Sequence, residues 1–170
     1  VDAAANTLKF EFNDDVKADV LNVIPGMRAG DIAVNAGLAT ANKRWCEVDF
    51  LTFESKAAKN VHVLGDSIQI APGMPKSGHM ANQHGKTCAA AVVALLTDQA
   101  VNTLPIYNNT CYSFVSAEEV VHVASVHRYD AAQKTMLTVP GSGGVSSAAN
   151  ALEAHYALAW ARNIWADTLA

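Results

Sequence analysis

Two short segments of the chain carry residue types that could bind a hydroxylated or anionic ligand. In the first, "VHVLGD" at positions 61–66, a β-branched run ends in Gly65 and Asp66. A carboxylate at the end of a strand could accept a hydrogen bond from a sugar-like hydroxyl, because open α/β sheets bind ligands at the carboxyl ends of their strands. An aspartate that caps a helix or a turn is the commoner case, and the dipeptide alone leaves both interpretations open.

The second segment, "PKSG" at positions 75–78, leads directly into an alanine-rich stretch that is predicted to be helical. The first-turn amides of a helix have no partner within the helix, and the helix dipole makes this end attractive to negative charge. A lysine beside it, Lys76, strengthens that attraction for an anionic group. An ordinary helix cap by Ser77 with a solvated lysine explains the same four residues.

Three widely spaced cysteines, Cys46, Cys88 and Cys111, fit neither a CxxC pattern nor a metal-ligand spacing. An odd number leaves at least one thiol without a partner in this chain. They are either small buried hydrophobic residues or include one that pairs with a cysteine outside this sequence. Cys46 is interpreted as structural, packed behind Trp45. No metal site is predicted, because two neighbouring histidines five positions apart are poorly placed on one helical face.

Both helices and strands are needed to position these candidate residues. A period-2 pattern predicts a strand at 6–12, and a second strand is expected at 18–26, so that the two form a hairpin. A short helix is expected to end near Gly37, and a strand at 59–66 is followed by a loop. The next helix is predicted at about 79–96, with an apolar stripe formed by Cys88, Val92, Leu95 and Leu96.

After Thr103 the pattern becomes β-rich. Strands are predicted in "NTCYSFVS", "EVVHVASVHRY" and "KTMLTVP", and "GSGG" at 141–144 is expected to be a flexible break. A final helix at about 147–168 carries large apolar groups on two faces, which predicts packing on both sides. The fold class is therefore α/β, with the character of an α+β fragment.

Composition excludes several classes of protein. The 170 residues are 51% hydrophobic and 16% charged, which is typical of a globular domain. The formal net charge of −4 and the lack of a basic cluster argue against nucleic acid as a partner. The longest uncharged apolar run, at 88–96, is far shorter than the roughly 20 residues of a membrane-spanning helix.

Five motifs occur in an order and spacing that resemble a known family. "VHVLGDS", "MPKSGHMANQHGK", "NNTCYSFVS", "VPGSGGV" and "AWARNIWADT" closely resemble the C-terminal half of the flavoprotein subunit of flavocytochrome c sulfide dehydrogenase. The resemblance runs over nearly the whole chain. It implies a fold like that of the glutathione-reductase group, in which the glycine-rich phosphate motif lies upstream of this sequence.

The resemblance also implies a division of the chain. Residues 1–102 would form the C-terminal part of the FAD-binding domain, including the exit from an inserted pyridine-nucleotide-like domain. Residues 103–170 would form the interface domain, an antiparallel sheet with a long C-terminal helix.

Site residues follow from the same resemblance. Asp66, with Gly65, would bind the ribityl chain of FAD, and Trp160 would lie near the flavin. Cys111 would be a redox-active cysteine that forms a disulfide with a partner cysteine from the N-terminal half. The pyrimidine edge of the flavin would be contacted by Lys76, Ser77, Gly78, Ala81 and Asn82.

The reaction that the resemblance implies is oxidation of sulfide through this disulfide and FAD, with transfer of the electrons to haem c in a separate cytochrome c subunit. The expected partners are the upstream half of the flavoprotein, which completes the FAD site, the cytochrome and sulfide, and the expected location is the periplasm. The isolated chain is expected to be inactive. Two alternatives remain: a fragment of a sulfide:quinone or NADH:quinone oxidoreductase-like flavoprotein, and a non-catalytic assembly module.

Overall fold

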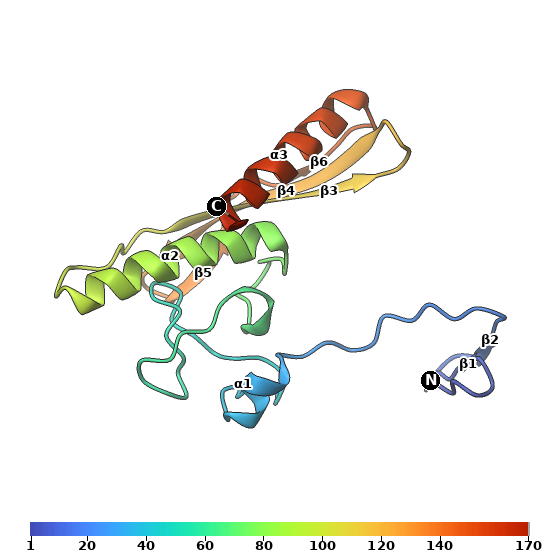
Figure 1. The fold of residues 1–170 in the computed structure, drawn as a ribbon, viewed down its shortest axis with the longest axis horizontal. Helices are drawn as coiled ribbons and strands as arrows, with labels where there is room; N and C mark the ends of the chain where they lie inside the picture. The colour runs from blue at the N-terminus through green and yellow to red at the C-terminus, as the bar shows by residue number, and fades with distance from the viewer. Residues whose placement is uncertain (170) are drawn as a thin grey trace.

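The computed structural model describes residues 1–169 and shows an α+β chain, as predicted. Figure 1 shows two long helices and an antiparallel sheet as the body of the molecule, from which the N-terminal segment extends. The elements, in chain order, are β1 (Thr7–Leu8), β2 (Val16–Lys17), α1 (Asp31–Asn35), the single 3-10 turn η1 (Gly65–Ser67), α2 (Gly78–Leu96), β3 (Ile106–Phe114), β4 (Val120–Asp130), β5 (Thr135–Thr138), β6 (Gly144–Val145) and α3 (Ala151–Leu169).

The sheet confirms the β-rich pattern after Thr103. Its strands run antiparallel in the order β3-β4-β5, and β6 also pairs with β4. In the register of β3 with β4, Cys111 lies opposite Val123. The prediction of a flexible break at 141–144 is wrong for its last residue. Gly144 is the first residue of β6 and pairs with Ala124.

Helix α2 begins and ends as predicted, but its buried face differs from the expected stripe. Ser77 caps the helix by accepting a hydrogen bond from the Met80 amide. The buried face is formed by Met80, His84, Cys88 and Ala91, at helical spacing. Leu95 and Leu96 are exposed, because the last turn of the helix extends past the core.

The free edge of β3 is covered by polar side chains of α2. The Asn108 amide donates to Gln83 Oε1 at 3.0 Å, and the Thr110 amide donates to His79 Nδ1 at 3.1 Å. Gln83 Nε2 also donates to the Asn108 carbonyl. Unpaired backbone groups on an edge strand invite association with other strands, so these contacts both satisfy the edge and fix α2 beside it.

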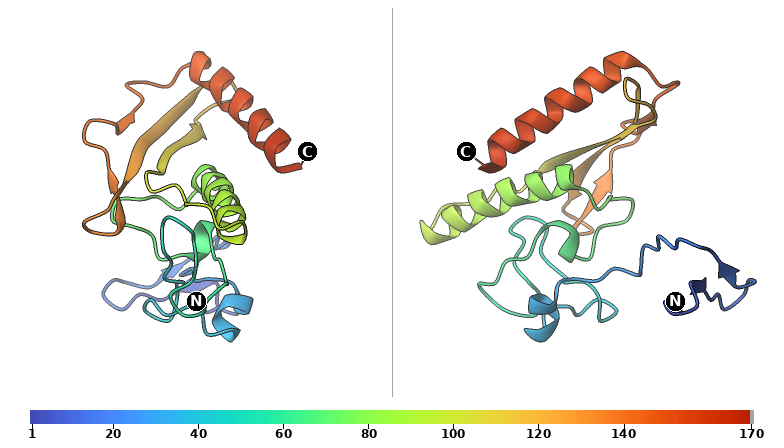
Figure 2. Two further views of the ribbon diagram at one scale, coloured as in Figure 1. Left: turned by 90° about the vertical axis from the view of Figure 1, so that its left-hand side faces the viewer. Right: turned by 45° about the vertical axis from the view of Figure 1, so that its right-hand side comes forward.

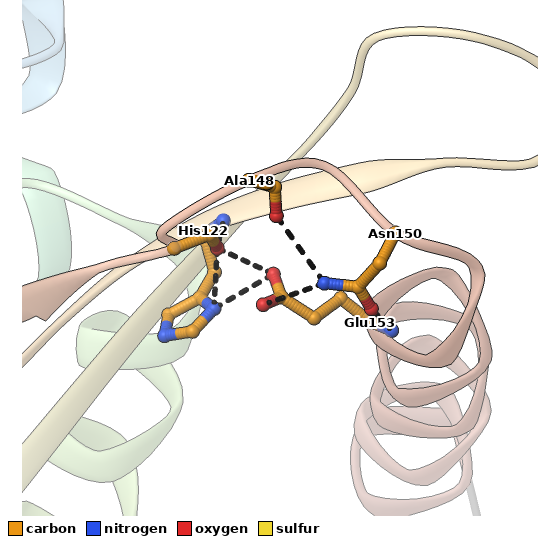
Figure 3. A network of polar contacts seen from close by, with 5 residues as sticks. His122, Ala148, Asn150 and Glu153 are labelled. Atoms are coloured by element: carbon orange, nitrogen blue, oxygen red, sulfur yellow. Dashed lines mark hydrogen bonds and ion pairs between the residues drawn. The ribbon is translucent and has the colours of Figure 1, made fainter.

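Helix α3 packs on the sheet through small residues. Ala154 and Ala157 are buried against Val120, with Tyr112 beside them. The prediction that both apolar faces of this helix are packed is wrong for this chain, because Leu158 and Trp165 are exposed. The start of the helix is held by Glu153, which contacts His122 of β4 and Asn150 (Figure 3).

The N-terminal part contains less regular structure than its sequence pattern predicts. A hairpin forms, but its two-residue strands pair Thr7–Leu8 with Val16–Lys17. The expected strand at 18–26 does not form. The expected strand at 59–66 is replaced by one bridge, between Glu54 and His62, followed by η1. A strand needs a continuous neighbour for its backbone hydrogen bonds. Within residues 1–169, the segment 59–66 bonds to Phe53 and Ser55, and the segment 18–26 bonds to Asn6 through the Ala18 amide, which is too little for a strand ladder. Figure 2 shows the first residues extending from the body.

The main core joins the two halves of the chain. Phe53, Ile68 and Met74 are buried together with Tyr107 of β3 and Met136 of β5. Residues on both sides of position 102 therefore contribute to one cluster. The division into an FAD-binding part and an interface part stays a prediction.

Candidate functional site

A groove lies between α2 and α3, and both helices contribute side chains to it. It has a cavity volume of about 570 Å³ and is lined by Gly78, Ala81, Asn82, Gly85, Lys86 and Ala89 of α2, and by Trp160, Ile164, Asp167 and Thr168 of α3. An adjoining hollow shares Asn82 and Trp160 and adds His79. The C-terminal half of α3 approaches α2 at this place (Figure 1), where Lys86 forms an ion pair with Asp167.

His79 and Trp160 both line the adjoining hollow. Their rings meet edge to face, with centroids 5.5 Å apart. Burial is the main reason that the pKa of His79 lies below its ordinary value, and nearby Lys86 lowers it further. Because His79 Nδ1 accepts the Thr110 amide, the neutral ring carries its proton on Nε2.

Trp160 contributes an unpartnered donor. Its indole Nε1 is buried and has no hydrogen-bond partner within residues 1–169. A buried N–H group without a partner is costly. The Trp160 side chain lines the groove, but its Nε1 atom is covered by protein.

Four of the predicted site residues meet in this groove. Gly78, Ala81 and Asn82 come from the first turns of α2, and Trp160 faces them from α3. The spacing of the first three follows from the helix, whereas the approach of Trp160 depends on how α3 lies over the sheet. Their binding to a flavin stays a prediction.

Gly65 packs against α2, the helix that forms one wall of the groove. It has a positive φ of +68°, and a Cβ at this position would come 3.3 Å from Ala81 Cβ. The Gly65 amide also donates to His84 Nδ1 at 3.3 Å. Asp66 is exposed on the same turn. The expected position of this dipeptide at the end of a strand is wrong, because it lies within η1.

Lys76 holds this turn in place. Its Nζ donates to the backbone carbonyls of Asp66 at 2.6 Å and Ile68 at 2.7 Å, and lies 3.7 Å from the centre of the Trp45 ring. Burial lowers the pKa of Lys76, and the charge of Asp66 counteracts this. The structure therefore shows Lys76 in a structural contact, and its predicted role at the flavin edge is left untested.

Ser77 connects the start of α2 to the cysteine strand. Its hydroxyl donates to Asn109 Oδ1 at 2.5 Å, and Asn109 Nδ2 donates to Cys111 Sγ at 3.3 Å. Asn109 and Cys111 are two positions apart on β3 and so lie on one face of the strand. Asn109 is only 3% exposed.

The three thiols differ in accessibility. All are free in the described structure, and Cys46 and Cys88 are buried, whereas Cys111 is partly exposed. Burial raises the pKa of Cys46 and of Cys88. Cys46 packs with Trp45, as predicted. Of the three, Cys111 is the one that a small reagent can reach.

Sequence reasoning missed the polar residues that join the elements. Asn109 carries a recognisable signal, because asparagine is unfavourable inside a strand and "NN" interrupts an otherwise apolar and aromatic pattern. Lys86 and Asp167 carry no such signal, since both are ordinary exposed helix residues 81 positions apart. In the described chain, no group of three or more His, Cys, Asp or Glu side chains is arranged to hold a metal ion.

Comparison with protein families places part of the chain in a known family model. Residues 103–169 match the family model described as flavocytochrome c sulphide dehydrogenase, flavin-binding. The match spans β3 to α3 and includes Cys111 and Trp160. It confirms the resemblance over this stretch, whereas Gly65, Asp66 and the first turns of α2 lie before it.

Proposed function

From this match to a flavin-binding domain, we propose that the chain forms part of an FAD-dependent sulfide dehydrogenase, which oxidises sulfide through a cysteine disulfide and FAD and passes the electrons to a cytochrome c. The observation that carries the proposal is the groove between α2 and α3. It joins Trp160, from the matching segment, to Gly78, Ala81 and Asn82 on the opposite wall.

The groove fits the ring system of a flavin in its size and its donors. Its volume of about 570 Å³ lies within the range of small-molecule pockets. The small side chains of Gly78 and Ala81 leave room for a flat ring, and the buried Trp160 N–H has no partner in the described structure. The carbonyl oxygens of a flavin's pyrimidine edge are suitable acceptors for it.

Residues of this chain would hold the cofactor by three kinds of contact. Trp160 and Asn82 would donate hydrogen bonds in the groove, and Asp66 would accept one from a ribityl hydroxyl. The first amides of α2 would favour negative charge on the ring edge. When bound, FAD supplies the ability to accept two electrons together and release them singly.

Cys111 would provide the sulfur chemistry. In a disulfide with a cysteine outside this chain, it would be open to attack by hydrosulfide. The attacking sulfur forms a bond to one sulfur of the disulfide as the S–S bond breaks, which leaves one cysteine as a persulfide and the other as a thiolate. This is ordinary thiol–disulfide exchange, with hydrosulfide in place of a thiol.

The partners of the proposed complex are the segment that supplies the other cysteine and the phosphate site, and a cytochrome c subunit that carries haem c. The proposed location is the periplasm, where disulfides persist. No helix within residues 1–169 has the length and apolar character to cross a membrane.

Substitution of Cys111 tests the proposal. In the complete flavoprotein that contains this chain, Cys111→Ser is expected to abolish sulfide-dependent reduction of cytochrome c, because no disulfide can form, while the flavin absorption spectrum is retained. Cys88→Ala is the control, since Cys88 is buried in the core face of α2 and is expected to leave turnover unchanged. Equal turnover of Cys111→Ser and the wild type would refute the role of Cys111.

A further inference from the structure

The neighbour of the Cys111 sulfur is a buried amide. Asn109 Nδ2 donates to Cys111 Sγ at 3.3 Å, and the protonated Cys111 thiol donates to Asn109 Oδ1 at 3.6 Å. The Asn109 side chain is 3% exposed, so it has little water with which to exchange these contacts. Asparagine is rare inside strands, which indicates a specific task at this position.

Ser77 fixes which end of this amide faces the sulfur. The Ser77 hydroxyl accepts the Met80 amide at 3.1 Å and therefore directs its own proton to Asn109 Oδ1 at 2.5 Å. The Asn109 oxygen accepts from Ser77 and from the Cys111 thiol, and a thiolate at Cys111 has no proton to donate, so it keeps only the bond from Asn109 Nδ2. A line of hydrogen bonds thus runs from the first turn of α2 to the sulfur.

We propose that Asn109 is a positioning residue that stabilises Cys111 as the thiolate, and so makes Cys111 the sulfur that departs when its disulfide is attacked. A hydrogen bond donated to the charged form favours that form. In the exchange step, a stabilised thiolate is the better leaving group. This inference rests on the proposed function, and it specifies which of the two cysteines receives the sulfide sulfur.

The bonds in this step balance. Hydrosulfide attacks the partner cysteine, and a bond forms between the sulfide sulfur and the partner sulfur. The bond from the partner sulfur to Cys111 Sγ breaks, its electron pair stays on Cys111, and the proton of hydrosulfide stays on the new persulfide. The persulfide therefore forms on the partner cysteine, and the negative charge is placed next to Asn109 Nδ2.

The test is the pH dependence of Cys111 alkylation by iodoacetamide in the free chain, followed by mass spectrometry of each cysteine. Asn109→Leu removes the donor and is expected to raise the pH midpoint of the reaction by about one unit. The thiolate then becomes about tenfold scarcer at neutral pH but about threefold more nucleophilic, so alkylation slows about three- to fourfold. Above both midpoints the variant should react faster, and the two pH profiles should cross.

Asn109→Asp tests the effect of the N–H donor, because it keeps the size and shape of the side chain. The carboxylate keeps the acceptor for Ser77 but places an oxygen where the N–H was, so this variant should react more slowly than Asn109→Leu at neutral pH. Asn108→Asp is the matched control, because the Asn108 side chain is exposed on the neighbouring position and its contacts with Gln83 use only the backbone. It adds the same charge and should leave the profile near that of the wild type.

Several results bear on the inference independently of folding and of sulfide turnover. The buried thiols Cys46 and Cys88 report opening of the fold in the same sample, and their reaction must stay slow for a variant to count. If the Asn109 variants follow the wild-type profile, or if Asn108→Asp shifts it as far as Asn109→Asp does, the inference is wrong. A shifted profile together with full sulfide turnover by Cys111→Ser would instead leave Asn109 correctly assigned and refute the proposed function.

The direction of the exchange can be measured on the same chain. A mixed disulfide between Cys111 and mercaptoethanol, treated with sulfide and quenched with iodoacetamide, should yield mainly carbamidomethylated Cys111 in the wild type. In Asn109→Leu, a larger share of the Cys111 persulfide is expected, since the leaving-group preference is reduced. An unchanged ratio would contradict the assignment of Cys111 as the leaving sulfur.

Discussion

At the scale of single residues, His84 links the turn that carries Asp66 to the core. Its ring lies between Phe53 and Tyr107, with centroids 4.7 Å and 5.2 Å away, and its Nδ1 accepts the Gly65 amide. The residue is 1% exposed. Burial, aided by the charge of Lys76, lowers the pKa of His84 to about 4. The neutral ring is therefore part of the folded state.

The stability of the chain is expected to depend on pH through His84. The unfolded state binds a proton near the ordinary histidine pKa of about 6.5, and the folded state binds it only near 4, so the free energy of unfolding falls as pH drops through this interval. The full effect is about 3 kcal/mol. Denaturant unfolding at several pH values should show this slope in the wild type and a flatter one in His84→Phe.

His155→Phe is the control for this prediction. His155 is exposed on α3, away from the core, and its replacement should leave the slope in place. Burial also lowers the pKa of His79 and of His127, so a smaller slope of the same sign should remain in His84→Phe. A His84→Phe variant with the full wild-type slope would contradict the assigned role.

At the scale of elements, the start of α3 is fixed by Glu153. Its Oε2 lies 2.8 Å from His122 Nδ1 and accepts the Ser146 hydroxyl at 2.5 Å, and its Oε1 accepts Asn150 Nδ2 at 3.2 Å. The network joins the helix to β4 (Figure 3). Through Ser146, it also reaches the residue after β6. The position of α3 determines that of Trp160, so this network supports the wall of the groove.

Glu153→Gln should destabilise the chain in a pH-dependent way. The Ser146 hydroxyl and then His122 hold the pKa of Glu153 below its ordinary value. The ionised carboxylate thus adds stability above the ordinary pKa, and this is lost as pH falls through the lowered value. The stability difference between the wild type and Glu153→Gln, measured by denaturant unfolding, should shrink with acidification. Glu118→Gln, at an exposed position, should show no such trend, and an equal trend in both would argue against the network.

At the scale of the whole molecule, the groove between α2 and α3 is open to solvent. No G-x-G-x-x-G phosphate motif occurs in the 170 residues. Large apolar side chains on the outer face of α3, Leu158, Trp165 and Leu169, are exposed. Contiguous exposed apolar groups of this kind mark surfaces that other protein covers. Both features agree with a chain that works together with further protein.

The isolated chain is expected to bind FAD weakly. The ring system can enter the groove, but this sequence contains no binding motif for the pyrophosphate. A dissociation constant of about 1 mM or higher is therefore expected, which corresponds to a binding free energy of no more than about 4 kcal/mol. Equilibrium dialysis measures it directly. Trp160→Phe keeps an aromatic side chain but removes the N–H donor. It should weaken any residual FAD binding about fivefold. Micromolar binding by the isolated chain, or equal binding by Trp160→Phe, would contradict this account of the groove.

Local sequence patterns predicted the elements that carry most of the site. Ser77 before an alanine-rich stretch predicted the start of α2, and the apolar alternation after Thr103 predicted β3, β4 and β5. The strands expected at 18–26 and 59–66 did not form. An apolar alternation shows that a segment is able to pair, but it does not place a partner strand beside that segment. A strand forms only when a second segment satisfies its backbone groups.

The sequence by itself determined the two long helices and the antiparallel sheet, because these depend on neighbours a few positions apart. Only the tertiary structure decided that Lys76 holds a turn, that α3 brings Trp160 to α2, and that Asn109 faces Cys111. The contact of Ser77 with Asn109 spans 32 positions, and that of Lys86 with Asp167 spans 81. No local periodicity encodes such pairs, since they form only when packing of the core brings distant elements together.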